Sequence, residues 1–301
     1  MNRFMLFTAA LLAGLASGAA HAAVNVFACE PEWASLAGEI GGDKVSVFSA
    51  TTALQDPHRI EARPSLIARM RSTDLMICSG ADLEAAWLPV LLQSAGNNKI
   101  QVGQTGYLLA AQSVPLLDVP ARVDRSMGDV HALGNPHMQL DPRNIARIAP
   151  VLAQRLAAID PGSASYYDAR LRDFDARWRK ALAEWEKRAA PLNGMKVVPY
   201  HKNLTYLLRW LGMVEVATIE SKPGVPPSAG ALSDLLVRLK SQPADAIVRA
   251  AYDDPKAPEW LAQRTGMPVV VTPYTVGGAP EAKDLFSLFD VTIDRLLKVT
   301  R

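Results

Sequence analysis

Hydrophobic and polar positions along the chain form two separate series of short runs. From residue 23 to about 158, strand-like runs at 24–28, 44–48, 74–78 and 99–102 alternate with helical patterns at 64–71 and 83–93. A second series begins near Gly194, with strand-like runs at 196–200, 214–219, 245–248 and 268–272. Its helical patterns lie at 204–211, 229–239, 258–264 and 285–297. This alternation predicts βαβ units and a mostly parallel sheet in each half.

The strongest helical pattern lies between the two series. Apolar residues recur every three or four positions, at Tyr167, Leu171, Phe174, Trp178, Leu182, Trp185 and Ala189. Asp160-Pro161 precedes this pattern and Pro191 follows it, as expected at helix boundaries. Charged residues on the other faces make the helix amphipathic, and about 30 residues at 1.5 Å each give a length of about 45 Å. We expect this helix to join the two halves rigidly.

The predicted fold class is therefore α/β: two (βα)4-like lobes with mostly parallel sheets, bridged by one long rigid α-helix. We expect a signal peptide at 1–22, an N-terminal lobe at 23–159, the bridging helix at 160–191 and a C-terminal lobe at 192–301. The signal peptide prediction rests on Arg3, on an apolar run after it, and on the small residues Ala20 and Ala22. The apolar run is shorter than the about 20 residues that span a bilayer. We therefore expect a secreted, periplasmic protein.

Composition narrows the class of protein further. Hydrophobic residues make up 49% of the chain and charged residues 21%, which is typical of a globular protein. The formal net charge is +2, and no block of like charge stands out. Nothing in this pattern points to nucleic acid or to an anionic membrane surface as a partner.

The two cysteines, Cys29 and Cys78, each close an apolar strand-like run. Export would place them in an oxidising compartment, where a disulfide can persist. If their strands are neighbours in a parallel sheet, the strand ends lie about 5 Å apart, within reach of a disulfide. We expect a disulfide, and buried free thiols or metal ligands remain as alternatives.

Histidine is the most informative residue type, because the chain has five and His21 lies in the predicted signal peptide. Three of the other four follow predicted strand ends or lie in proline-marked turns: Asp56-Pro57-His58, Asn135-Pro136-His137 and Pro199-Tyr200-His201. In open α/β sheets, ligands bind beyond the carboxyl ends of the strands. The chain has neither an HExxH nor a paired CxxC motif. The pattern alone therefore leaves a shared metal site and structural histidines both open.

A series of motifs then runs through the whole mature chain in a fixed order. They are Asp56-Pro57-His58 with Arg63-Pro64-Ser65, Gly80-Ala81-Asp82-Leu83-Glu84, Gly134-Asn135-Pro136-His137 with Leu140-Asp141-Pro142, Tyr200-His201-Lys202, and Lys222-Pro223-Gly224-Val225-Pro226-Pro227-Ser228. This series resembles the metal-specific solute-binding proteins of ABC transporters, the zinc/manganese uptake family. The resemblance implies two lobes bridged by a long helix, with a metal ion held in the cleft between them.

The resemblance also implies metal ligands. His58 and His137 would come from the first lobe and His201 from the second. Imidazole ligands suit zinc, while manganese prefers oxygen ligands, so the expected cargo is Zn²⁺ and Mn²⁺ is the alternative. Three imidazoles and one oxygen would fit a tetrahedral zinc site.

The sequence departs from the family at the fourth ligand. The family's usual aspartate after the last strand is missing, and Val276 stands in its place. Glu220, which follows a predicted strand end, is the first candidate to fill the position. Asp284, His131 or a water molecule are the alternatives.

We therefore expect a binding protein, not an enzyme, that captures Zn²⁺ and delivers it to the membrane permease of an ABC transporter. We expect a monomer, and a periplasmic metallochaperone is a further candidate partner. A manganese-importer component, a periplasmic zinc chaperone and a surface adhesin are alternatives with the same site. The rival class is a zinc hydrolase with Glu220 as a base, but no nucleophile or oxyanion motif accompanies the histidines.

Overall fold

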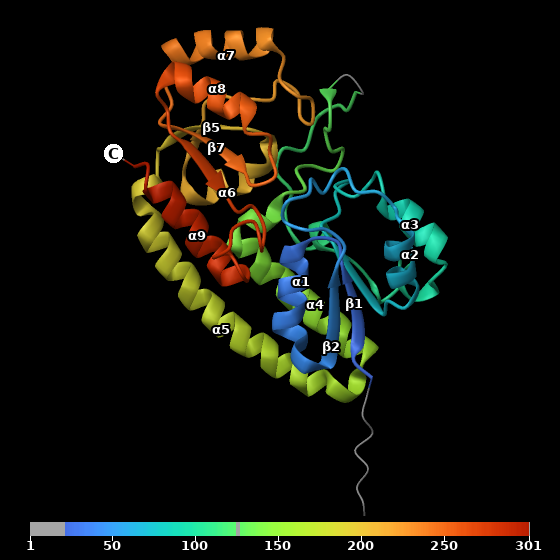
Figure 1. Ribbon diagram of the computed structural model, residues 1–301. Helices are drawn as coiled ribbons and strands as arrows, with labels where there is room; N and C mark the ends of the chain where they lie inside the picture. Colours follow the sequence, from blue (N-terminus) through green and yellow to red (C-terminus); the bar gives the residue numbers. More distant parts are fainter. Residues whose placement is uncertain (1–21, 125–126, 301) are drawn as a thin grey trace, which may run out of the picture.

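The computed structural model of the chain describes residues 22–124 and 127–300. The predicted signal peptide therefore lies, except for Ala22, outside the described residues. In the part of the chain that is described, no helix has both the length and the apolar character that a membrane crossing requires. Two sheets with helices packed against them form two lobes, and one long helix runs along both of them (Figure 1).

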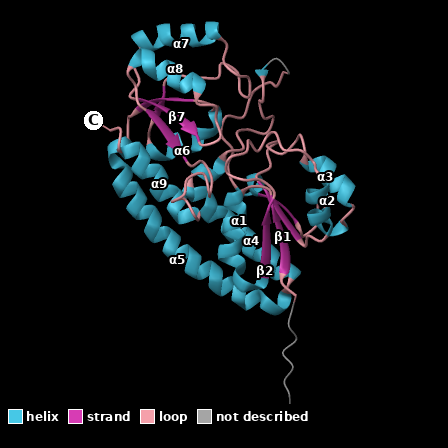
Figure 2. Ribbon diagram, in the orientation of Figure 1, coloured by secondary structure: helices cyan, strands magenta, loops and turns pink. Residues whose placement is uncertain are grey.

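Each lobe contains a four-stranded parallel sheet of the same plan (Figure 2). The first sheet has the order β2-β1-β3-β4, with β1 at Val24–Ala28, β2 at Val45–Ser49, β3 at Leu75–Cys78 and β4 at Tyr107–Leu109. The second has the order β6-β5-β7-β8, with β5 at Lys196–Pro199, β6 at Val214–Glu215, β7 at Ala246–Ala250 and β8 at Val269–Thr272. The predicted fold class is confirmed.

Helices cover both faces of each sheet. In the first lobe they are α1 (Pro31–Gly41), α2 (Pro64–Arg71), α3 (Leu88–Ala95) and α4 (Pro142–Ile159). In the second they are α6 (Thr205–Leu211), α7 (Ala229–Ser241), α8 (Lys256–Thr265) and α9 (Leu285–Leu297). Successive strand residues point to opposite faces, so Val26 of β1 packs with α1 and α4, whereas Phe27 packs with α2 and α3.

The predicted bridging helix is present as α5 (Ala164–Ala189), with a short 3-10 turn at each end. Its Trp178 is fully buried, and the indole N–H donates a hydrogen bond to the carbonyl of Pro142 at the start of α4. The same ring lies 4.9 Å from the ring of Phe286 in α9. Since α4 belongs to the first lobe and α9 to the second, one apolar core joins the lobes along α5.

The prediction of a strand at 99–102 is wrong. Residues Asn98–Ile100 form a 3-10 turn, in which the Asn97 side chain accepts a hydrogen bond from the amide of Lys99. The fourth strand is β4, whose Leu108 pairs with Ile77 of β3. Ile100 is buried and Val102 is exposed, so these two apolar residues imitate a strand pattern without forming one.

The segment after β3 is a tight turn, and this delays the helix predicted to begin at residue 83 until Leu88. The Glu84 carboxylate accepts hydrogen bonds from the amides of Ser79 and Gly80, at 2.8 and 3.0 Å. Ala81 and Asp82 then adopt positive φ angles of 49° and 67°, which few residues other than glycine adopt. The turn faces the cleft, because the Asp82 backbone contacts His131.

Cys29 directly follows β1, and Cys78 is the last residue of β3. The two cysteines are joined in a disulfide. The two strands are neighbours in the first sheet, and the two Cα atoms are 4.8 Å apart. Both side chains are fully buried. The bond therefore ties together the two strands whose ends lead into α1 and into the turn at Ser79.

Candidate metal centre

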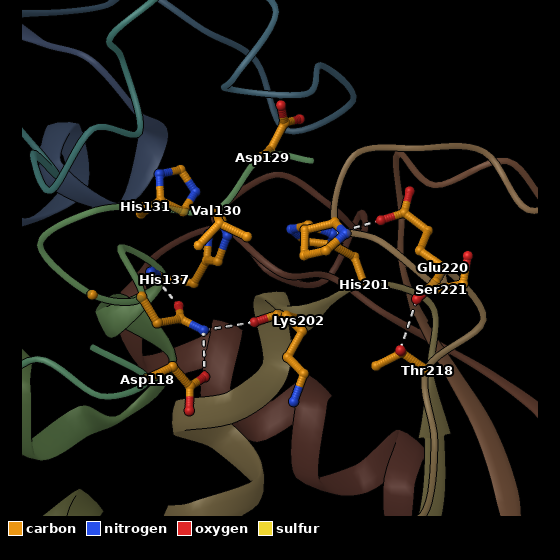
Figure 3. Close-up of a pocket in the computed structure, with 13 residues that line it drawn as sticks. Asp118, Asp129, Val130, His131, His137, His201, Lys202, Thr218, Glu220 and Ser221 are labelled. Atoms are coloured by element: carbon orange, nitrogen blue, oxygen red, sulfur yellow. Dashed lines mark hydrogen bonds and ion pairs between the residues drawn. The ribbon is translucent and has the colours of Figure 1, made fainter. Parts of the chain in front are cut away.

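Four imidazoles meet in the cleft beyond the carboxyl ends of the strands. The ring centroid of His58 lies 5.2 Å from that of His137 and 5.7 Å from that of His201. The centroids of His58 and His131 are 5.3 Å apart. Figure 3 shows His131, His137 and His201 around a cavity of about 310 Å³, which residues of both lobes line. The structure thus brings together the three histidines chosen from the sequence and His131, which was only an alternative.

Two of the histidines are placed by turns of the same design. In Asp56-Pro57-His58, the Asp56 carboxylate accepts a hydrogen bond from the amide of His58 at 3.0 Å. In Asn135-Pro136-His137, the Asn135 side-chain oxygen accepts one from the amide of His137, also at 3.0 Å. Such turns are common where an Asp or Asn side chain bonds the backbone two residues on. The Asn135 amide also donates to the carbonyl of Lys202, so this turn bridges to the second lobe.

Three of the imidazoles are held through their Nδ1 atoms. The Nδ1 of His58 lies 2.7 Å from an oxygen of Asp56, and the Nδ1 of His201 lies 2.7 Å from Oε2 of Glu220. The Nδ1 of His137 lies 2.7 Å from the hydroxyl of Tyr274. Metal-binding histidines usually have such a partner on the second ring nitrogen, because it fixes the tautomer and the ring orientation. In all three rings Nε2 remains for a ligand.

His131 enters the cleft on a segment that joins the lobes. The amide of Asp129 donates to the carbonyl of Pro223 at 2.8 Å, and Arg59 donates to the carbonyl of Gly224 at 2.6 Å. The two segments approach so closely that a Cβ on Gly224 would meet the side-chain carboxylate of Asp129, and the φ of 72° at this position also favours glycine. This contact holds His131 across from His58.

Burial keeps two of the imidazoles neutral. His137 is 1% exposed, and burial, followed by the neighbouring His58, lowers its pKa well below the ordinary value. Burial, followed by His58 and His201, lowers the pKa of His131 to about 4. Burial alone would raise the pKa of Asp56, but its hydrogen bond with His58 lowers that pKa below its usual range. Neutral imidazoles beside ionised carboxylates are the protonation states that bind metal cations.

The spacing of His58, His131 and His137 suits ligands of one shared metal ion. The Nε2 atoms of His58 and His131 are 3.3 Å apart, and two ligands of a tetrahedral zinc with Zn–N of about 2.0–2.1 Å are about 3.3–3.4 Å apart. Ligand atoms of His58, His131 and His137 all lie within 4.8 Å of one another. The Nε2 of His137 is buried and has no hydrogen-bond partner among the described residues, and such an atom is costly unless a ligand engages it.

The other candidates for the fourth ligand have different places. Glu220 lies behind His201 and also accepts a hydrogen bond from the amide of Gly224 at 2.8 Å. Asp284 is the N-cap of α9, where it accepts from the amide of Ser287. Val276 lines a separate groove. Tyr274 is the residue that the sequence analysis missed, although it lies in the same stretch as Val276; no motif marked it.

Comparison with known proteins gives a consistent result. The model of one protein family, described as zinc-uptake complex component A, periplasmic, matches residues 26–299. The chain is 22% identical to the manganese ABC transporter substrate-binding lipoprotein PsaA of Streptococcus mitis over 306 residues, 98% of this chain and 96% of that protein. It is 22% identical to the iron ABC transporter substrate-binding lipoprotein MtsA of Streptococcus pyogenes serotype M1 over 255 residues, 83% of this chain and 79% of that protein.

A solved structure agrees with the fold. The crystal structure of ZnuA superposes with a TM-score of 0.78 at 23% identity, covering 93% of this chain and all of that one. At this level of identity the similarity establishes the architecture of two lobes and a long helix.

Proposed function

Because the chain belongs to the family of periplasmic zinc-uptake complex component A proteins, we propose that it captures Zn²⁺ between its lobes and delivers the ion to an ABC import permease. The family consists of solute-binding transport components, so the expectation of a binding protein rather than an enzyme is confirmed. The observation that carries the proposed site is the buried Nε2 of His137. It is surrounded by three other imidazoles and has no hydrogen-bond partner in the part of the chain that the structure describes.

We propose four ligands, with His131 completing the set of His58, His137 and His201. Imidazole nitrogen suits zinc, copper and nickel, whereas manganese prefers oxygen. The named relatives carry manganese and iron, and the four nitrogens of this cleft are the reason for proposing zinc here.

Capture in this scheme requires little rearrangement of the ligands. Asp56 and Glu220 only accept hydrogen bonds, so they hold the protons of His58 and His201 on Nδ1 and leave the lone pairs of Nε2 toward the cleft. The ion exchanges its water for these nitrogens. Release would follow when the permease breaks the hydrogen bond between Asp129 and Pro223, because that bond holds the segment on which His131 lies.

A substrate-binding component of an ABC transporter has a membrane permease as its partner. We further propose that the protein is a monomer, that the signal peptide is cleaved after Ala22 and that the mature chain acts in the periplasm. A periplasmic metallochaperone that loads the cleft remains a proposal of the same kind.

The test is competition calorimetry of the metal-free chain from Ala23, with zinc and then manganese. One tightly bound zinc ion per chain, lost in a His58→Ala, His137→Ala, His201→Ala triple variant, would support the site. Zinc binding unchanged in the triple variant, or absent in the unaltered chain, would overturn it. A His131→Ala variant that binds zinc as tightly as the unaltered chain would reduce the ligand set to three.

A further inference from the structure

Tyr274 has an unusual backbone conformation for its residue type. Its φ is 68°, a left-handed value that is a genuine outlier for a bulky side chain. Such a conformation costs on the order of 1–3 kcal/mol and persists only where its surroundings hold it. The residue follows β8 and its side chain is 3% exposed.

The strained backbone aims the phenol at the metal site. The hydroxyl lies 2.7 Å from Nδ1 of His137, and the two ring centroids are 6.0 Å apart. The phenol ring packs edge-on against Tyr252, with centroids 5.2 Å apart. Burial, followed by the nearby Glu32, raises the pKa of Tyr274 well above its ordinary value, so the phenol stays neutral.

A contact between the lobes holds the next residue. The hydroxyl of Thr275 donates a hydrogen bond to the carboxyl group of Glu32, which lies in the first turn of α1. Both side chains are almost fully buried. The chain then closes on itself, since the amide of Gly278 donates to the carbonyl of Thr275. Thr275 is thus fixed on both sides, and Tyr274 cannot relax without breaking one of these bonds.

We propose that Tyr274 is a positioning residue of the metal site: it orients the imidazole of His137 through Nδ1, and the Glu32–Thr275 hydrogen bond holds Tyr274 in the left-handed conformation that this requires. The inference rests on the proposed function. It assigns a role to the stretch in which the expected aspartate is missing: instead of supplying a ligand, the stretch orients one.

Tyr274 also differs from the other two Nδ1 partners in chemistry. Carboxylates accept hydrogen bonds only, whereas a phenol can donate or accept. The phenol can therefore accept a hydrogen bond from the Nδ1–H of His137 when Nε2 binds a metal ion. In the metal-free protein the phenol can donate to Nδ1 instead, with the ring proton on Nε2.

The test is zinc affinity of Tyr274→Phe beside Tyr252→Phe. Both changes delete one hydroxyl, but that of the half-buried Tyr252 accepts a hydrogen bond from Asn203 instead of contacting an imidazole. Loss of a hydrogen-bond partner behind a metal ligand typically costs about 10- to 100-fold in affinity. We expect this loss for Tyr274→Phe and a change below threefold for Tyr252→Phe. The visible spectrum of bound Co²⁺ should shift only in Tyr274→Phe, which a purely structural role would not produce.

The role of the Glu32–Thr275 hydrogen bond is tested by Thr275→Val and by two changes at Glu32. Thr275→Val and Glu32→Leu should weaken zinc binding in the same direction as Tyr274→Phe, whereas Glu32→Gln keeps an acceptor and should restore most of the affinity. If Thr275→Val binds zinc like the unaltered chain, the Glu32–Thr275 hydrogen bond does not hold Tyr274 in place.

The His137→Ala variant distinguishes a failure of the positioning role from a failure of the metal site itself. If Tyr274→Phe retains full affinity while His137→Ala loses it, the positioning role fails and the metal site stands. If His137→Ala also retains full affinity, the metal site itself fails.

Discussion

The Nδ1 of His201 lies 2.7 Å from Oε2 of Glu220, and the two residues follow neighbouring strands of the second sheet. Oε2 also accepts from the amide of Gly224. One carboxylate oxygen therefore fixes both a candidate ligand and the loop that meets the segment of His131. Asp56 has the same role at His58. Its Oδ1 contacts Nδ1 of the His58 ring and also accepts a hydrogen bond from the His58 amide.

We predict that Glu220→Gln and Asp56→Asn each weaken zinc binding by about 10- to 100-fold, because each amide holds the imidazole tautomer less firmly. Calorimetry measures the change. Asp74→Asn is the matched control, since Asp74 pairs with Lys99 at 2.7 Å outside the cleft. An equal loss in all three variants would show that the effect is not specific to the site.

Zinc affinity should depend on pH less steeply than four ordinary histidines would make it. The pKa of His131 is lowered to about 4, and that of His137 lies well below its ordinary value. These two rings therefore have no proton to release between pH 7 and 5.5, and the ion competes with at most two protons. A plot of log Kd against pH in this window should have a slope below two. A slope near four would contradict the neutral state of the two rings.

Stability of the metal-free protein should fall as pH rises above 6.5. Burial raises the pKa of Glu32 and of Glu84 to about 7, and that of Glu30 well above its ordinary value. The folded protein holds these protons where the unfolded chain has released them, so this stabilisation is complete below the unfolded pKa and is lost as pH rises through the folded pKa. His131 and His137 act in the opposite sense, but only below their ordinary pKa of 6.5.

Denaturant unfolding between pH 6.5 and 8 measures this fall, to which each carboxyl contributes at most about 1.4 kcal/mol per pH unit. A double variant, Glu32→Gln with Glu84→Gln, should reduce the slope. Part of it should remain, because burial also raises the pKa of Asp253 to about 7. The exposed Glu259→Gln is the control, and an unchanged slope in the double variant would refute the assignment.

The disulfide should stabilise the fold without taking part in binding. Cys29 and Cys78 are 49 residues apart in the sequence, and a cross-link of this length typically contributes about 2–4 kcal/mol. We expect Cys29→Ala with Cys78→Ala to lower the free energy of unfolding by that amount and to leave zinc affinity within threefold. A large loss of affinity in a variant that still folds would place the bond among the determinants of the site.

The sequence predicts most of the fold because strong local patterns mark its elements. The stripe from Tyr167 to Ala189 identifies α5, and seven of the eight predicted strand positions hold a strand. The missing one, at 99–102, fails because pairing with β3 decides which apolar run becomes a strand. Such pairing joins residues distant in the chain, and a local pattern does not contain it.

The candidate site is predicted in part for a similar reason. The turns before His58 and His137 are local, since Asp56 and Asn135 act two residues ahead of each histidine. Tyr274 reaches a histidine 137 positions away, and no neighbouring residue marks that contact. Glu220 was identified from the sequence as a candidate ligand. The placement of the strands decides which ring nitrogen of His201 it contacts, and a local pattern does not contain that placement.

The two carboxylates behind His58 and His201 have a consequence for the charge of the captured ion. Neutral imidazoles leave the full charge of the cation in place, and Asp56 and Glu220 together supply two negative charges. A divalent ion makes this group of charges neutral overall. A monovalent ion would leave one negative charge in excess and a trivalent ion one positive charge, and uncompensated charge in a partly buried cleft is costly. In the proposed site the arrangement would therefore favour divalent ions over monovalent and trivalent ones, a preference that ligand geometry alone does not set.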